Sequence, residues 1–255
     1  MLSISLQTGS LERGFRLTGN FGIYGEVLLR NDTQILRSLE YGLLVTVLTL
    51  VIAYPVAYTI AFRGGRWKNA LLFLVILPFF VSFVIRTLEW RFLLSDGGII
   101  LGPLKGLGII GEGFRVIATP IAVVGGLIYN FFPFMTLPLY VSLEKMDRSL
   151  LDAAGDLYSS RVTAFLRVTL PLSLPGIFAG SLLTFIPAVG DFINVEFLGG
   201  PEQTMIGNVI QFEYLTTNDY PEAAALSFVL MLGILIAVTI YARLLGTEEL
   251  TGGAG

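Results

Sequence analysis

Five long apolar stretches dominate this chain of 255 residues and restrict the folds that it can adopt. A helix needs about 20 mostly apolar residues to cross the hydrocarbon core of a membrane. Only 14% of the residues are charged, whereas an ordinary soluble domain has roughly 25%. We therefore predict an all-α, polytopic transmembrane bundle of about five spans. These are Tyr41–Phe62, Ala70–Leu94, Val116–Leu143, Val168–Gly190 and Ala223–Ala242.

The basic residues indicate how these spans are oriented. Arg63–Lys68 holds three basic residues and no acid, and the connection 144–168 holds four basic residues. Glu196–Glu222, by contrast, holds five acids and no basic residue. Because short cytoplasmic loops are enriched in Lys and Arg, we expect the first two segments and the C-terminus to be cytoplasmic. Glu196–Glu222 is then expected outside.

The same pattern divides the chain into three parts. Residues 1–34 form an outer N-terminal segment, residues 35–245 the transmembrane domain, and residues 246–255 a flexible, Gly-rich C-terminal tail. The N-terminal segment carries several charges, and nothing upstream would transfer them across the membrane. We expect either a missing first span before Met1 or insertion of the segment by the pull of the following helix.

Residue types that are absent exclude several classes of function. The chain contains no cysteine and no histidine, so it lacks a thiol nucleophile, thiolate metal ligands and the commonest general base. No basic cluster is dense enough to follow a nucleic-acid backbone, and no P-loop motif for binding nucleotide phosphates is present. We therefore expect no catalytic residue, no metal site, no cofactor on this chain and no nucleic-acid partner.

The connection 144–168 has more internal pattern than a plain linker. Ser149 and Asp152 have the spacing of a capping box, which starts a helix, and Ser160 can cap a second helix. Asp152 and Asp156 share one face of the first helix. The opposite, apolar face consists of Leu150, Leu151, Ala154 and Leu157. We predict a cytoplasmic helix–turn–helix on which a partner docks. The alternative is a simple connecting loop.

This connection resembles the EAA loop in the permease subunits of ABC importers. Asp152-Ala153-Ala154 matches the opening of that loop with Asp for Glu, Phe165 matches its central aromatic residue, and Leu170-Pro171 matches its close. Tyr158 stands where the family has glycine. The resemblance implies a coupling helix that an ATPase subunit grips. Its implied coupling residues are Leu150, Leu151, Asp152, Ala153, Ala154, Asp156, Leu157, Tyr158 and Phe165.

The likeness extends over most of residues 35–245. The chain is similar to the B-type permeases of spermidine/putrescine importers at Tyr54–Tyr58, Leu77–Thr87, Leu137–Tyr140 and Phe185–Phe192. Members of that family normally have six spans, and the first of these is the one without a counterpart here. The resemblance implies the helical fold of type I ABC importer permeases.

The resemblance also implies an ATP-driven importer in the inner or plasma membrane of a prokaryote. An ATPase dimer would bind ATP and Mg²⁺, a second permease would complete the pathway, and an extracytoplasmic binding protein would deliver a polyamine. Membrane lipid would surround the spans. The alternatives are a permease for another small solute, such as ferric iron or a phosphonate, and an ion-driven secondary transporter. The central thirds of the spans hold no ionisable group, which disfavours the last.

Four residues near the outer ends of spans are candidates for contact with the solute: Asp191, Glu196, Glu89 and Trp90. Carboxylates would neutralise the ammonium groups of a polyamine, and an aromatic face attracts cations. The alternative is that these residues are merely solvated at the membrane surface. We expect such a solvated surface, which could meet a binding protein, for the acids Glu202, Glu213, Asp219 and Glu222.

Overall fold

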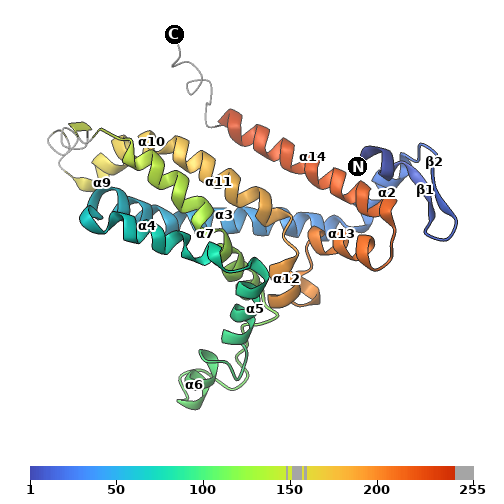
Figure 1. The fold of residues 1–255 in the computed structure, drawn as a ribbon, viewed down its shortest axis with the longest axis horizontal. Coiled ribbons are helices and arrows are strands. Elements are labelled where there is room, and N and C mark those ends of the chain that lie inside the picture. Colours follow the sequence, from blue (N-terminus) through green and yellow to red (C-terminus); the bar gives the residue numbers. More distant parts are fainter. Residues whose placement is uncertain (148, 151–156, 158–159, 245–255) are drawn as a thin grey trace, which may run out of the picture. The chain divides into compact units, whose positions relative to one another are not determined.

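The computed structural model describes residues 1–147, 149, 150, 157 and 160–244, and helices dominate that part of the chain (Figure 1). The chain divides into two compact units. The first unit consists of Met1–Val45, Ser82–Tyr129 and Ile186–Ala237. The second unit consists of Thr46–Val81, Asn130–Phe185 and Val238–Gly255. The segments that the charge pattern predicts to be cytoplasmic all belong to the second unit.

Three helices are each long and apolar enough to cross a membrane: α3 (Asp32–Arg63), α7 (Pro120–Glu144) and α14 (Tyr220–Leu244). Two bent pairs of helices raise the number of candidate spans to as many as five. One pair consists of Gly65–Phe80 and Phe83–Leu93, and the other joins Val162–Leu172 to Leu174–Val189 at 65°. The predicted all-α, polytopic bundle is confirmed.

The second predicted span is not one continuous helix. It consists of η1 (Gly65–Trp67), α4 (Lys68–Ile76), η2 (Leu77–Phe80) and α5 (Phe83–Leu93). Pro78 lies in η2, where it cannot donate the N–H that an uninterrupted helix requires. Val81 and Ser82 are extended, with ψ values of 138° and 137°. The span is therefore interrupted between η2 and α5.

The N-terminal part of the first unit contains a small β-hairpin that the sequence pattern did not predict. α1 (Leu2–Ser5) precedes β1 (Gln7–Ser10), which pairs with β2 (Gly14–Leu17) in an antiparallel arrangement with Gln7 opposite Leu17. α2 (Gly22–Arg30) follows the hairpin. Ile23 and Val27 on α2 are buried in one cluster with residues of α13 (Ile206–Leu215) and α14. This cluster joins the N-terminal segment to the later helices of the unit.

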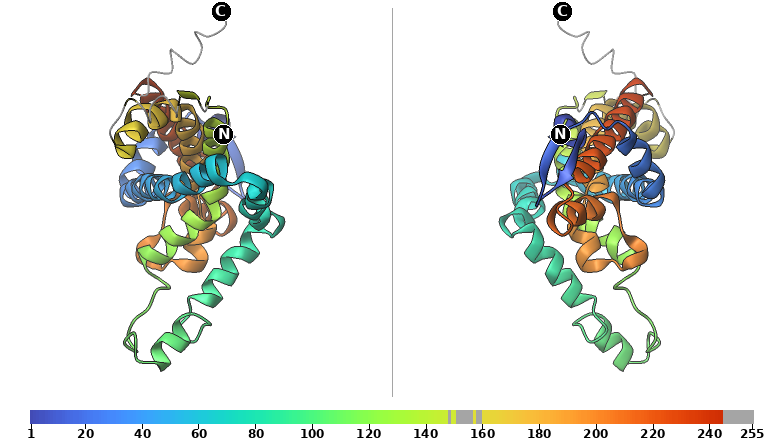
Figure 2. Two further views of the ribbon diagram at one scale, coloured as in Figure 1. Left: turned by 90° about the vertical axis from the view of Figure 1, so that its left-hand side faces the viewer. Right: turned by 90° about the vertical axis from the view of Figure 1, so that its right-hand side faces the viewer.

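Elsewhere in the first unit, α5 packs against α12 (Ile193–Leu198), and η4 (Pro201–Gln203) connects α12 to α13. The segment after α5, which includes α6 (Leu101–Gly106), extends away from α12 and α13 (Figure 2). Ion pairs close this segment on itself: Lys105 Nζ lies 3.0 Å from Asp96, and Arg115 Nε lies 3.2 Å from the same carboxylate.

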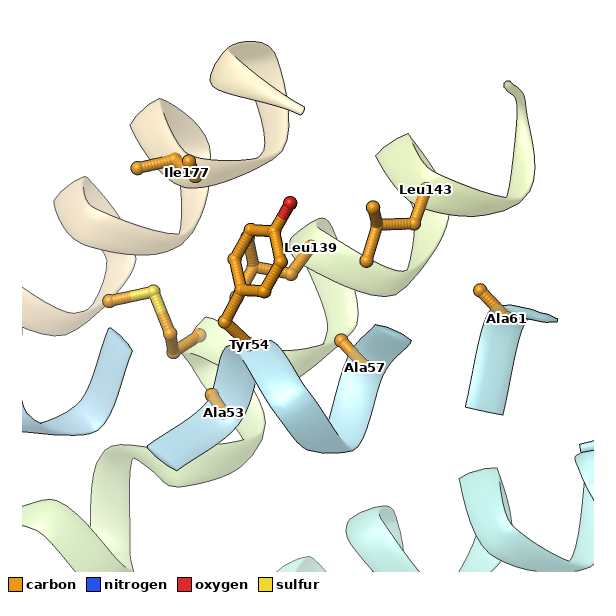
Figure 3. Packing of buried hydrophobic residues seen from close by; sticks show 8 residues of the cluster. Ala53, Tyr54, Ala57, Ala61, Leu139, Leu143 and Ile177 are labelled. Atoms are coloured by element: carbon orange, nitrogen blue, oxygen red, sulfur yellow. The ribbon is translucent and has the colours of Figure 1, made fainter. Parts of the chain in front are cut away.

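The core of the second unit forms where α3, α7 and α11 (Leu174–Val189) meet (Figure 3). Ala53, Ala57 and Ala61 recur every four residues, so they form a strip of small side chains on one face of α3. Small residues allow helices in a membrane to approach closely. The buried members of this core are Ala53, Tyr54, Ala57, Ala61, Met135, Leu139, Leu143 and Ile177.

Two glycines let α11 approach the backbone of α7. A Cβ atom added to Gly176 would lie 2.8 Å from the carbonyl oxygen of Pro138, and one added to Gly180 would lie 3.0 Å from that of Met135. The two glycines are four residues apart, which is the small-xxx-small spacing of close helix pairs in membranes. This contact fixes where α11 starts relative to α7.

We expect Gly180→Val to weaken this contact, because its side chain has no room beside Met135. Overpacking of this kind costs about 1–3 kcal/mol, so the purified protein in detergent should have a lower melting temperature. Gly125→Val on α7 is the matched control, since nothing lies within 4 Å of a Cβ atom added there. Equal melting temperatures for the two variants would contradict the packing argument.

Candidate functional site

The predicted coupling residues fall largely outside the described part of the chain. Leu151, Asp152, Ala153, Ala154, Asp156 and Tyr158 lie there, so their predicted roles stay predictions. Leu150 and Leu157 are described and are 48% and 79% exposed. Leu150 also lines a cavity of about 500 Å³ together with residues of α7, α10 (Leu170–Leu172) and α11. These two apolar side chains are accessible to a partner.

Side-chain caps flank the coupling segment on both sides. The carboxylate of Asp147 accepts a hydrogen bond from the backbone N–H of Ser149 at 2.9 Å, and this bond lowers the pKa of Asp147. Ser160 Oγ accepts the backbone N–H of Thr163 at 3.1 Å, so its predicted capping of α9 (Arg161–Ala164) is confirmed. The capping partner predicted for Ser149, Asp152, lies outside the described residues.

Phe165 is half-buried and points into the core of the second unit. It begins η3 (Phe165–Thr169), a single π-helical segment. Its ring meets that of Tyr54 edge-on, with centroids 5.4 Å apart, and lies 6.4 Å from that of Tyr58. The hydroxyl of Tyr54 lies 2.8 Å from Ser173 Oγ, a hydrogen bond that is buried. Sequence reasoning identified Phe165 but missed Tyr54 and Ser173.

Asp191 is the second residue after α11 and is only 7% exposed. Its carboxylate accepts the backbone N–H of Asn194 at 2.8 Å and the side-chain N–H of Asn194 at 3.1 Å. Burial raises the pKa of Asp191 to about 6, and the two bonds from Asn194 oppose that rise. Asn194 in turn approaches Gly126 on α7, where an added Cβ would lie 2.8 Å from its Oδ1 atom. Asp191 therefore anchors the first turn of α12.

Glu196 has a different environment from Asp191. It is exposed and is the charged residue in the lining of a cavity of about 470 Å³ between α12, η4 and α13. Phe212, which is 53% exposed, lines the same cavity. Asn208, another lining residue, is held in place because its side chain donates to the carbonyl of Phe192 at 3.0 Å. The cavity thus combines an accessible carboxylate with an accessible aromatic ring.

The other two solute candidates lie on α5. Glu89 is exposed, whereas the ring of Trp90 packs edge-on against Tyr129 of α7 at 5.2 Å. The guanidinium of Arg86 lies over the same tyrosine, 6.0 Å from its centroid. Neither Glu89 nor Trp90 belongs to the lining of the Glu196 cavity. The structure therefore brings Glu196 and Phe212 together at one cavity and places Trp90 in a separate aromatic group.

The expected solvated surface of outer acids is wrong for two of its members. The side chains of Glu213 and Glu222 are 15% and 13% exposed. Both pair with Arg30 on α2, Glu213 at 4.0 Å and Glu222 more closely. Because Arg30 lies far from them in the sequence, spacing alone could not reveal this pairing. These acids join α2 to α13 and α14.

The sequence matches the family described as "Binding-protein-dependent transport system inner membrane component" over residues 42–246. This chain belongs to that family. The spermidine/putrescine transport system permease protein PotB of Escherichia coli (strain K12) is 40% identical over 221 residues, which are 87% of this chain and 78% of that protein. PotB of Haemophilus influenzae is 39% identical over 81% of this chain and 72% of its own length.

Solved structures share the fold of this permease. A crystal structure of a bacterial ABC transporter involved in the import of the acidic polysaccharide alginate has a TM-score of 0.66 at 19% identity. The matched region covers 91% of this chain and 84% of the solved chain. The predicted family, helical permease fold and inner-membrane location are confirmed. The relatives are transport permeases, and no group of three or more potential metal ligands occurs among the described residues.

The buried carboxylate of Asp191 should make the stability of the permease depend on pH. Its folded-state pKa of about 6 exceeds its ordinary value of 3.8. Between pH 4 and 6 the folded protein therefore holds more protons at this carboxyl group than the unfolded chain does. The free energy of unfolding therefore falls as pH rises through that range, by about 3 kcal/mol at most. Asp191→Asn should lack this contribution.

The measurement is the melting temperature of the wild type and Asp191→Asn in detergent from pH 4 to pH 8. The difference between the two proteins isolates Asp191 from the other carboxyl groups. Parallel curves would show that the environment of Asp191 does not oppose ionisation.

Proposed function

We propose that this permease carries polyamines such as spermidine and putrescine from an extracytoplasmic binding protein into the cytoplasm. The observation that carries this proposal is its 40% identity with PotB over 87% of the chain. A likeness of that extent reaches beyond the fold, which the alginate transporter shares at 19% identity. Exposed Glu196 supplies the negative charge that a polycation requires.

The energy for transport would come from partner subunits. An ATPase dimer would bind ATP and Mg²⁺, and a second permease would complete the pathway through the membrane. The ATPase would grip the coupling helix Leu150–Tyr158, followed by Phe165. The exposure of Leu150 and Leu157 supports this role, because apolar side chains that a partner can cover stabilise docking.

On the outer side, Glu196 and Phe212 would contact the solute directly. The carboxylate would neutralise one ammonium group, and the adjacent ring would attract the same charge by a cation–π interaction. Asp191 would act through Asn194, because its carboxylate accepts two hydrogen bonds from that residue, and these bonds set the start of α12. Glu89 and Trp90 on α5 would form a further contact, since α5 packs on α12.

The test of the transported solute is uptake into proteoliposomes that contain the permease, its partner subunits and the binding protein. We expect ATP-dependent uptake of labelled spermidine. Glu196→Gln should reduce this uptake about tenfold, because a charge-assisted contact contributes about 1.5 kcal/mol. Glu202→Gln is the matched control: Glu202 is an exposed acid of the same segment and does not line the cavity.

The same vesicles also receive labelled ferric iron and a labelled phosphonate. Uptake of either of these solutes without uptake of spermidine would overturn the polyamine proposal. Equal spermidine uptake by Glu196→Gln and the wild type would remove Glu196 from the pathway.

The coupling helix can be tested by binding alone. Ala153→Trp should abolish co-purification of the permease with the ATPase subunit, because a large side chain would block close docking of a partner backbone. Ala153→Ser, which keeps a small side chain, is the control. Normal co-purification of the tryptophan variant would remove the coupling-helix assignment.

A further inference from the structure

The chain is sharply bent where the coupling segment enters the fourth span. Val162–Leu172 and Leu174–Val189 meet at 65°, with Ser173 between them. The π-helical η3 precedes this break, and Pro171 and Pro175 flank it. Proline removes a backbone donor, and a π-helical turn is wider than an α-helical one, so this stretch is a poor transmitter of force by itself.

Ser173 satisfies the backbone at the break. Its N–H donates to the carbonyls of Thr169 and Leu170, at 3.0 and 3.1 Å. Its hydroxyl donates to the carbonyl of Leu170 at 2.8 Å. A serine hydroxyl has one hydrogen, so the hydroxyl of Tyr54 must be the donor in the 2.8 Å bond to Ser173 Oγ. The direction of this bond is thereby determined.

Tyr54 contacts the chain before the break and at the break itself. Its ring meets Phe165 on the loop side, and its hydroxyl meets Ser173, the residue directly before α11. The side chain is 9% exposed, and its neighbours Ala53 and Ala57 on α3 are fully buried. In Figure 3 the ring of Tyr54 projects from α3 into the space between α7 and α11. Tyr54 is therefore held firmly by α3 while it touches two points eight residues apart.

We infer that Tyr54 is a positioning residue that transmits displacement of the coupling segment to α3 and α11. This inference rests on the proposed docking of an ATPase on that segment. A push on the loop reaches α3 through Phe165 and the ring of Tyr54, and it reaches α11 through the Tyr54–Ser173 hydrogen bond. Without that bond, the two sides of the break move independently, so ATP is hydrolysed without a matching movement of the spans.

The decisive variant is Tyr54→Phe, which removes the hydroxyl and keeps the ring. In the reconstituted transporter, we expect its ATP hydrolysis to stay within twofold of wild type while spermidine transported per ATP falls at least fivefold. Ser173→Ala should have the same effect, and the double variant should be no worse than Ser173→Ala, because the second change removes a bond that is already lost. Tyr41→Phe, the same change at a buried tyrosine of α3, is the control.

A purely structural role would lower transport and ATP hydrolysis in the same proportion. The amount of spermidine transported per ATP would then stay unchanged, and that result would overturn the inference. Should Tyr54→Phe fail to assemble with the ATPase, Phe165→Leu provides the second test, because it keeps apolar bulk and removes the ring contact. The same fall in solute transported per ATP is expected for it, and an unchanged ratio would again overturn the inference.

A second readout does not depend on the solute. The chain has no cysteine, so Val51→Cys on the exposed face of α3 accepts a single fluorophore. ATP with vanadate should change the emission of this fluorophore in the otherwise wild-type protein and in the Tyr41→Phe variant. The emission should not change in the Tyr54→Phe variant. An unaltered response in Tyr54→Phe overturns the inference. A response in the wild type without spermidine uptake overturns the polyamine proposal and leaves the role of Tyr54 standing.

Discussion

Close approach of helix backbones is the constraint on which the second unit depends. Lipid tails are as apolar as leucine, so helices in a membrane associate through packing rather than through removal of apolar surface from water. The alanine strip on α3 and the glycine pair Gly176 and Gly180 on α11 meet this requirement against α7. A tyrosine ring has a fixed length, so Tyr54 can reach Ser173 only while α3 and α11 are held this near to each other.

Two side chains of this framework, Ser173 and Asp191, bond backbone groups where a helix ends. An interruption frees backbone N–H and C=O groups that lipid cannot bond. Ser173 bonds the carbonyl of Leu170 at the break before α11, and Asp191 bonds the N–H of Asn194 after α11. α11 is thus bounded by two side-chain bonds that are local in the sequence. Interruptions stabilised in this way are places where a bundle can bend without losing its hydrogen bonds.

The sequence was sufficient for features that depend on sums over many residues. Hydropathy summed over about 20 residues predicts the spans, and the cap at Ser160 follows from a spacing of three residues. Contacts between distant segments left no local pattern. Tyr54 and Ser173 are 119 residues apart, and Arg30 pairs with acids of α13 and α14. In the second span, Pro78 lies in η2, but the interruption that follows depends on Val81 and Ser82 becoming extended.

The two carboxylates of the segment Asp191–Glu196 have contrasting environments. Asp191 is buried, and its hydrogen bonds to Asn194 hold the first turn of α12. Glu196 lies later on the same short helix and faces a cavity. A buried carboxylate loses its hydration and resists ionisation, so it would be a poor first contact for a cation arriving from water. An exposed carboxylate can meet such a cation directly, but it needs a rigid support to stay at the cavity that Phe212 also lines. In the proposed pathway, the anchoring of α12 by Asp191 provides that support for Glu196.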